Sequence, residues 1–262
     1  MPTPLVRTYA DIAVLIAGGT SGVGLATARA FADAGVRRIA LLGRDSGRGA
    51  AARQQVADHC PEARVEFLAC DAGVVAQVED TVGRAHALLG GLDVLVSSTT
   101  AAYRPDLLHR TDPADLEAIL VGQALPPMLL TRIVLPYLQE QGGGSIINIA
   151  SDAAKVPTPG EAALGGAMAA IVMFSKVAAL EAKRNGVRVN VLTPSLIAGT
   201  TTAANVLSDG FSKRLFEKAA TQAHLGVAEP DDLAAMAVYL GGPAAARITG
   251  QTISVNGGVS VA

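Results

Sequence analysis

Short, unbroken apolar runs alternate along the chain with longer segments in which apolar residues recur at helical spacing. Runs of this kind are typical of strands that are covered on both faces of a parallel sheet. They lie at Asp11–Ala17, Arg38–Leu42, Val65–Ala69, Leu92–Val96, Ser145–Ala150, Val187–Leu192 and Thr252–Val255. The intervening segments predict helices over residues 22–34, 47–58, 74–89, 113–140, 161–184, 203–221 and 230–241.

This regular alternation of strand and helix indicates right-handed βαβ units. We therefore expect an α/β fold, with residues 1–262 forming a single domain. Its centre would be a Rossmann-type, doubly wound parallel sheet of about seven strands, with helices on both faces. The sequence contains no recognisable linker or repeat, and the glycines at 142–144 are expected to form a turn before a strand.

Composition narrows the function. Half of the 262 residues are hydrophobic, with five Phe, four Tyr and no Trp, so the core must be mostly aliphatic. The net charge of −2 and the absence of a basic stripe argue against nucleic acid as a partner. The two Cys and four His show no metal-ligand spacing, so we expect no metal site. The apolar run 12–17 is too short for a signal-peptide core or a membrane span, which predicts a cytoplasmic protein without a membrane partner.

A glycine motif follows the first predicted strand and precedes the first predicted helix. In such a motif one Gly makes the tight turn, one lets the backbone approach a pyrophosphate, and one lets the helix pack on the strand. The alternative is that the glycines serve only the turn. The candidate cofactor-binding residues here are Gly18, Thr20, Ser21, Gly22, Val23 and Gly24.

Two further residues are candidates for binding the adenosine part of a dinucleotide. Arg44 follows the second strand, where a carboxylate would bind the 2′-hydroxyl of NAD; an Arg there can meet a 2′-phosphate, which favours NADP over NAD if either binds. Asp71, with Ala72 beside it, follows the third strand and can accept a hydrogen bond from the adenine amino group. The alternatives are a solvated Arg44 and an Asp71 that caps helix 74–89.

Together these motifs resemble the short-chain dehydrogenase/reductase family over nearly the whole chain. The matching segments, in order, are GGTSGVG (18–24), CDA (70–72), LDVLV (92–96), SIINIAS (145–151), GVRVNVLTP (186–194) and ITGQTISVNGG (248–258). The resemblance implies a Rossmann-type fold, commonly a tetramer, and nicotinamide-dependent oxidoreductases as the usual members.

The resemblance also shows what this chain lacks. Family members use a Ser, a Tyr and a Lys, with an Asn on the preceding helix; the Lys lowers the high pKa of the Tyr hydroxyl, which transfers the proton. Ser151 matches the Ser, but Leu164 and Met168 stand where the Tyr and Lys are expected, and Gln123 stands at the Asn position. The register is the same whether it is counted from Ser151 or back from Asn190. We interpret Ser151 as vestigial, a buried strand-end hydroxyl bonded to backbone.

Two loops depart from the family pattern in the same direction. Residues 97–100 read Ser-Ser-Thr-Thr in place of Asn-Asn-Ala-Gly, and Pro194 is followed by Ser195 in place of Gly. Leu164 and Met168, four apart on a helix, either form ordinary core or interface, or line a pocket with other chemistry. Such chemistry would need another group, and Tyr103 and Lys155 are the candidates.

Three functions remain open. The first is a non-catalytic, structural or substrate-shaping subunit that pairs with a catalytically competent paralogue in a heterotetramer. It would be similar to the inactive partner in heteromeric members such as hydroxybenzylsuccinyl-CoA dehydrogenase. The resemblance implies that helices 113–140 and 161–184, and the segment 248–262, form its interfaces. The second is an active oxidoreductase, as a homo-oligomer, on a ketone or hydroxyacyl substrate with non-standard acid–base residues. The third is a sensor that binds NAD or NADP without turnover. The resemblance also implies that residues 200–225 cover the substrate.

Overall fold

A seven-stranded parallel sheet forms the centre of the structure, a computed structural model that describes residues 7–207 and 210–262. The strand order β3-β2-β1-β4-β5-β6-β7 reverses direction between β1 and β4, as in a doubly wound sheet. The strands are β1 (Ala13–Ala17), β2 (Arg38–Gly43), β3 (Arg64–Ala69), β4 (Val94–Ser97), β5 (Gly144–Ile149), β6 (Val187–Thr193) and β7 (Thr252–Ser254). The predicted fold class and strands are therefore confirmed, with small shifts at their ends.

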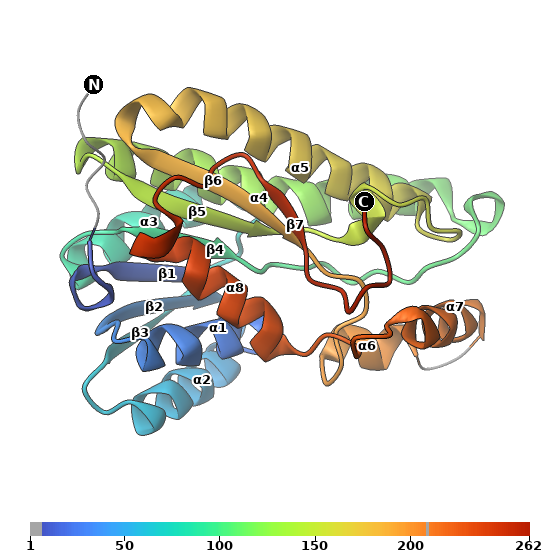
Figure 1. Ribbon diagram of the computed structural model, residues 1–262, viewed down its shortest axis with the longest axis horizontal. Coiled ribbons are helices and arrows are strands. Elements are labelled where there is room, and N and C mark those ends of the chain that lie inside the picture. The colour runs from blue at the N-terminus through green and yellow to red at the C-terminus, as the bar shows by residue number, and fades with distance from the viewer. Residues whose placement is uncertain (1–6, 208–209) are drawn as a thin grey trace.

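Helices cover both faces of this sheet, and Figure 1 shows α1, α2 and α8 on one side and α3, α4 and α5 on the other. Two further helices, α6 and α7, project beyond one end of the sheet. The helices are α1 (Gly22–Asp33), α2 (Ser46–His59), α3 (Val75–Leu89), α4 (Pro113–Glu140), α5 (Ala162–Ala182), α6 (Thr201–Val206), α7 (Gly210–Gln222) and α8 (Pro230–Gly241).

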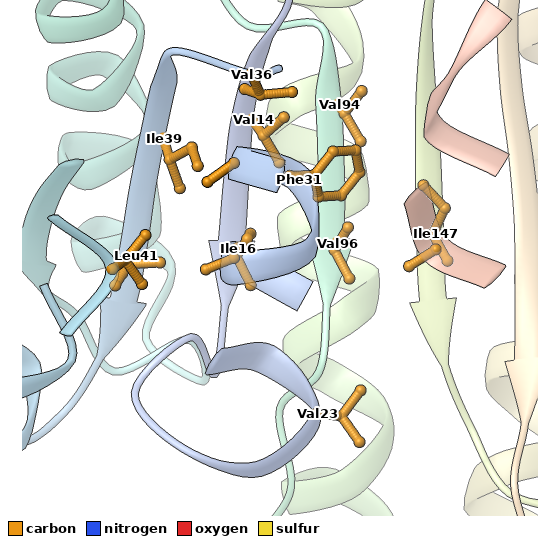
Figure 2. Close-up of a cluster of buried hydrophobic side chains, with 14 of the residues drawn as sticks. Val14, Ile16, Val23, Phe31, Val36, Ile39, Leu41, Val94, Val96 and Ile147 are labelled. Atoms are coloured by element: carbon orange, nitrogen blue, oxygen red, sulfur yellow. The ribbon is translucent and has the colours of Figure 1, made fainter. Parts of the chain in front are cut away.

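The core is divided by the sheet into two apolar layers. On the α1 side, Phe31 packs against Val14 of β1 and Val94 of β4 (Figure 2), and it is fully buried. The other buried members of this cluster are aliphatic, as the composition predicts, and Tyr9 and Phe67 pack against it while only partly buried. On the other side, residues of α3, α4 and α5 cover the same strands. This packing holds the carboxyl ends of the strands in fixed positions for the loops that follow them.

Two predicted elements are wrong in part. Asp11 does not begin the first strand but ends a 3₁₀ turn, Tyr9–Asp11, where its carboxylate accepts a hydrogen bond from Thr8 Oγ1 at 2.6 Å. Residues 203–221 are not one helix. Helix α6 ends at Val206 and α7 begins at Gly210, whose φ of +65° does not continue a right-handed helix through this point; residues 208 and 209 of the expected helix lie outside the described residues.

The central strands are buried on both faces, as predicted, whereas the edge strands are partly exposed. Every residue of β1 and β4 is buried, whereas β7 is half-buried throughout and β3 exposes both of its ends. Helices α4 and α5 are long and apolar enough to cross a membrane by length and composition. Residues of both helices pack against the sheet in the core. Core helices of globular proteins often pass this test, so it is weak evidence for a membrane span.

Candidate functional site

A cleft of about 800 Å³ lies at the carboxyl ends of the strands. Residues that directly follow β1, β2, β3, β4, β5 and β6 all line it: Gly18, Arg44, Cys70, Ser98, Ala150 and Pro194. This edge, next to the reversal of strand order, is where doubly wound sheets bind their ligands. The volume is within the range of cofactor and small-molecule sites.

The glycine motif forms one end of the cleft, and each glycine has its own structural reason. Gly18 has φ +75°, and a Cβ there would lie 2.3 Å from the carbonyl oxygen of Ser98. A Cβ on Gly24 would lie 2.2 Å from the Gly18 carbonyl oxygen, so Gly24 lets α1 approach the loop. Gly22, with φ +49°, faces open space, and its nearest neighbour would be a Thr200 methyl at 3.6 Å. The loop therefore has both the tight turn at Gly18 and the open space at Gly22 through which a ligand can approach the backbone.

The amino end of α1 is suited to an anion. Ser21 occupies the N-cap position but its side chain makes no capping hydrogen bond, so it does not satisfy the first N–H groups of the helix. Together with the helix dipole, such N–H groups attract a phosphate. Four residues of the motif line the cleft here: Thr20, Ser21, Gly22 and Val23. These residues fit the pyrophosphate of a dinucleotide.

The adenosine end of the cleft carries two arginines. Arg44 and Arg48 both line it, and Arg44 makes no ion pair within residues 7–207 and 210–262. Asp45, the carboxylate nearest the end of β2, accepts a hydrogen bond from Arg48 N at 2.8 Å and caps α2, and it does not line the cleft. Asp71 and Ala72 line the cleft as well.

The alternative reading of Asp71 as a helix cap is wrong. Val74 holds the N-cap position of α3, while the Asp71 carboxylate accepts a hydrogen bond from Gly73 N at 2.9 Å within its own turn. The turn therefore leaves Asp71 at the wall of the cleft, and an adenine contact stays a prediction for this residue.

At the inner end of the cleft, Leu164 and Met168 form an apolar wall. Both line the cleft, and their exposed fractions are only 9% and 7%. They pack with Ile171, Val172 and Val191 in a small buried cluster. Leu164 and Met168 therefore both pack in the core and line the cleft, so the two alternatives are not exclusive. Neither side chain has an ionisable group that could exchange a proton.

The remaining predicted site residues are occupied with structural hydrogen bonds. The Ser151 hydroxyl accepts from Ala153 N at 3.2 Å, as expected for a backbone-bonded group, but Ser151 is half-buried and lines the cleft rather than being buried. Gln123 is buried, and its side-chain amide makes two hydrogen bonds to Ala101: Nε2 donates to the carbonyl at 3.0 Å and Oε1 accepts from N at 3.4 Å. Gln123 thus holds the loop that follows β4.

Neither candidate replacement group is free to transfer protons. The Tyr103 hydroxyl lines the cleft but donates to the Gly160 carbonyl at 2.5 Å, and burial, with the carboxylates of Glu161 and Asp106, raises its pKa. Lys155 does not line the cleft. Its Nζ donates to Ser254 Oγ at 2.5 Å and lies 3.6 Å from Asp152 Oδ1, so it anchors the C-terminal segment.

One cleft residue was missed by the sequence reasoning. Glu161 is 8% exposed, lines the cleft, and lies one helical turn before Leu164. Burial raises the pKa of its carboxyl group to about 7, although a hydrogen bond with the Thr158 side chain opposes the shift. In the sequence it looks like an ordinary acidic residue at a helix start. The available signal was its spacing, because 161, 164 and 168 fall on one helical face.

The segment expected to cover substrate does lie over the cleft. Helices α6 and α7 contribute Val206, Leu215, Phe216 and Lys218 to its lining, and Figure 1 shows both helices beyond the end of the sheet. The described part of 200–225 therefore borders the cleft with a mixture of apolar and polar side chains, the polar ones including Thr200, Asn205 and Gln222.

Comparisons with known proteins agree with this architecture. A family model described as enoyl-(acyl carrier protein) reductase matches residues 17–260. The chain is similar to an uncharacterized oxidoreductase of Mycobacterium tuberculosis, with 34% identity over 95% of this chain and 92% of the relative. It is 31% identical to the D-threitol dehydrogenase of Mycolicibacterium smegmatis, over 94% and 92% of the two chains.

Solved structures give the same result. A short-chain type dehydrogenase/reductase from Mycobacterium ulcerans superposes with a TM-score of 0.89 at 25% identity, covering 97% of this chain and 91% of that one. Levodione reductase superposes with the same TM-score and identity, covering 96% and 98%. With a cleft, a glycine loop and a sheet order of this kind, the chain belongs to the short-chain dehydrogenase/reductase family of NAD(P)-dependent oxidoreductases.

Proposed function

We propose that this chain is the non-catalytic, structural or substrate-shaping subunit of an NAD(P)-dependent hydroxyacyl or alcohol dehydrogenase complex. The observation that carries the proposal is the apolar wall of Leu164 and Met168 at the inner end of the cleft. From the family resemblance we expect the proton-transferring Tyr and its Lys at these two positions. Loss of one general acid–base group lowers a rate by roughly 10²–10⁴-fold, and here the group that tunes it is missing too.

The outer faces of α4 and α5 support an assembly role. Leu120 and Val121 on α4 and Met173, Val177 and Leu180 on α5 are exposed by 44% to 62%. Apolar side chains gathered on two adjacent helices are typical of a surface that is covered by another protein. From the resemblance we expect these helices to pair with another protomer. We propose that this protomer is a paralogue that has the Tyr and the Lys.

Co-expression with neighbouring genes, followed by mass measurement of the purified complex, tests this proposal. We expect a hetero-oligomer, such as a heterotetramer, whose activity depends on the Tyr and Lys of the partner. Leu180→Glu, which places a charge on the exposed apolar face, is expected to weaken the complex; Lys213→Glu on α7 is the control away from that face. A stable homotetramer that turns over carbonyl substrates by itself would contradict the proposal.

A second function is favoured by one observation. Because Glu161 is an ionisable group on the cleft wall beside Leu164, an active oxidoreductase on a ketone or hydroxyacyl substrate would have a non-standard acid–base group at hand. If the isolated chain turned over such a substrate and Glu161→Gln abolished the turnover, this function would be favoured over the non-catalytic subunit.

The cofactor end supports binding of NAD(P), and we propose NADP as the preferred form. When bound, the dinucleotide supplies the hydride in this family; the first turn of α1 would hold its pyrophosphate, and Arg44 its 2′-phosphate. Met168 offers no donor to the nicotinamide ribose, so the affinity rests on the adenosine half.

Arg44→Ala is expected to lower the affinity for NADP(H) by about 10–100-fold, because one charge-assisted hydrogen bond contributes about 1.5–3 kcal/mol. The affinity for NAD(H), which lacks the 2′-phosphate, should change little. Titration calorimetry with both cofactors measures the two affinities, and Arg48→Ala is the matched control because Arg48 is already paired with Asp45. Equal losses for NADP(H) and NAD(H) would show that Arg44 does not read the 2′-phosphate.

A further inference from the structure

The inner end of the cleft combines the buried carboxyl group of Glu161 with apolar side chains; the other buried carboxylate of the lining, Asp152, is bonded to Asn256 and Ser260. Glu161 lies at the start of α5, Leu164 and Met168 follow it on the same helix, and Val206 and Phe216 line the cleft from the covering helices. A pocket of this composition takes a ligand with an apolar body and fixes its orientation through few polar contacts.

The surroundings of Glu161 favour its uncharged form. No cation lies within ion-pair distance of its carboxyl group in the described part of the chain; the facing groups are the Thr158 and Tyr103 hydroxyls, and Asp106 bonds to the adjacent Gly160 carbonyl through its backbone N. The amino end of α5 attracts negative charge, but Glu161 makes no capping hydrogen bond, and burial outweighs that attraction. The other titratable residues that line the cleft are Arg44, Arg48, Cys70, Asp71, Asp152 and Lys218.

The groups next to Glu161 are already engaged. The Tyr103 hydroxyl gives its hydrogen to the Gly160 carbonyl, and Asp106 N donates to the same oxygen at 3.1 Å. Lys218 reaches the cleft from α7, where its side chain is exposed. The Ser151 hydroxyl accepts from Ala153 N and keeps its own hydrogen, so Glu161 and Ser151 both can present a hydrogen to a bound molecule, and of the two only Glu161 is a carboxylic acid.

We propose that the neutral carboxyl group of Glu161 donates a hydrogen bond to the oxygen of an uncharged carbonyl compound with an apolar body, and that ionisation of Glu161 releases this ligand. A carboxylic acid has one O–H donor, whereas a carboxylate only accepts. After ionisation, a carbonyl oxygen would face a carboxylate oxygen without a hydrogen between them, and both are acceptors. Because the pKa of Glu161 is about 7, the change takes place near neutral pH.

Binding of acetophenone by the isolated wild-type chain, followed by ligand-observed NMR from about pH 5.5 to about pH 8.5, tests the proposal. We expect tight binding at the acidic end and a dissociation constant that rises roughly tenfold per pH unit above the pKa of Glu161. Glu161→Gln should bind at every pH with no such rise, because an amide N–H also donates to a carbonyl oxygen. Glu161→Leu should bind weakly at every pH.

Glu217→Gln, on the exposed face of α7, is the matched control and should keep the wild-type pH dependence. The proposal is overturned if the wild type does not bind acetophenone at about pH 6, or if Glu161→Gln keeps the same pH dependence. A second readout needs no ligand: infrared difference spectra of the wild type should show a protonated carboxyl band that disappears as the pH rises past about 7. Absence of that band would overturn the proposal even if the Gln variant failed to fold.

This inference does not rest on the partner subunit. All measurements use the isolated chain and report binding or protonation, not turnover. If co-expression gave no hetero-oligomer while the isolated chain showed the predicted pH dependence, the proposed assembly would be contradicted and the role of Glu161 would stand. A hetero-oligomer without the pH dependence would do the opposite.

Discussion

Alanine at position 18 is expected to lower the free energy of unfolding by about 2–5 kcal/mol. Gly18 has φ +75°, and a side chain in this left-handed region costs about 1–2 kcal/mol. In addition, the new Cβ would lie 2.3 Å from the Ser98 carbonyl oxygen, so the ends of β1 and β4 would have to separate, at about 1–3 kcal/mol for an overpacked site.

Gly22→Ala is the matched control for this clash, because Gly22 also has a positive φ, +49°, but faces open space. It should lose only about 1–2 kcal/mol. Urea denaturation measures both values, and equal losses would show that the contact with Ser98 is not tight. The two variants should differ in a second way: Gly22→Ala places a methyl group in the cleft and should weaken dinucleotide binding while the fold persists.

The second large effect is a loss of stability as the pH rises through the range where Glu161 ionises. Its pKa is about 7 in the folded chain against an ordinary value of 4.5, so the folded state holds a proton that the unfolded state has released. Stability from this group is therefore fully present below about pH 4.5 and is lost by about pH 7. The shift of about 2.5 pKa units (7 minus 4.5) corresponds to roughly 3 kcal/mol.

Other groups titrate in the same range, so the quantity to measure is the difference between wild type and Glu161→Gln. That variant cannot ionise, and its stability relative to wild type should rise by about 3 kcal/mol between about pH 4 and about pH 8. Urea denaturation at each pH gives this difference, with Glu217→Gln as the exposed control. A difference that stays constant with pH would mean that Glu161 is solvated in solution.

The sheet and its helices could be predicted because their signals are local. The buried runs of β1, β2 and β4 to β6 and the glycine loop after β1 depend on neighbours in the sequence, and all appear where expected. The break between α6 and α7 was missed because a glycine inside a helical pattern is tolerated in many helices; only the structure shows that α6 ends at Val206 and that Gly210, with φ +65°, begins a new helix.

The position of the site could be predicted from the sequence, but which of its groups are free to react could be predicted only in part. Resemblance placed Ser151, Leu164 and Met168 at the inner end of the cleft, and the structure brings all three to its wall. Lys155 was a poor candidate for a reason that no local pattern reveals: its partners, Ser254 and Ala262, are about a hundred residues away in the chain.

The sequence by itself determined the family, the fold class and the phosphate-binding loop of this protein, because spacing and hydrophobic pattern follow directly from the order of residues. Only the tertiary structure decided which polar groups remain available. Burial against distant segments engages the Gln123 amide, the Tyr103 hydroxyl and the Lys155 ammonium. The same burial removes water from the Glu161 carboxyl and raises its pKa to about 7. Desolvation is the sum of all neighbours in space, and these neighbours come from loops and helices far apart in the chain.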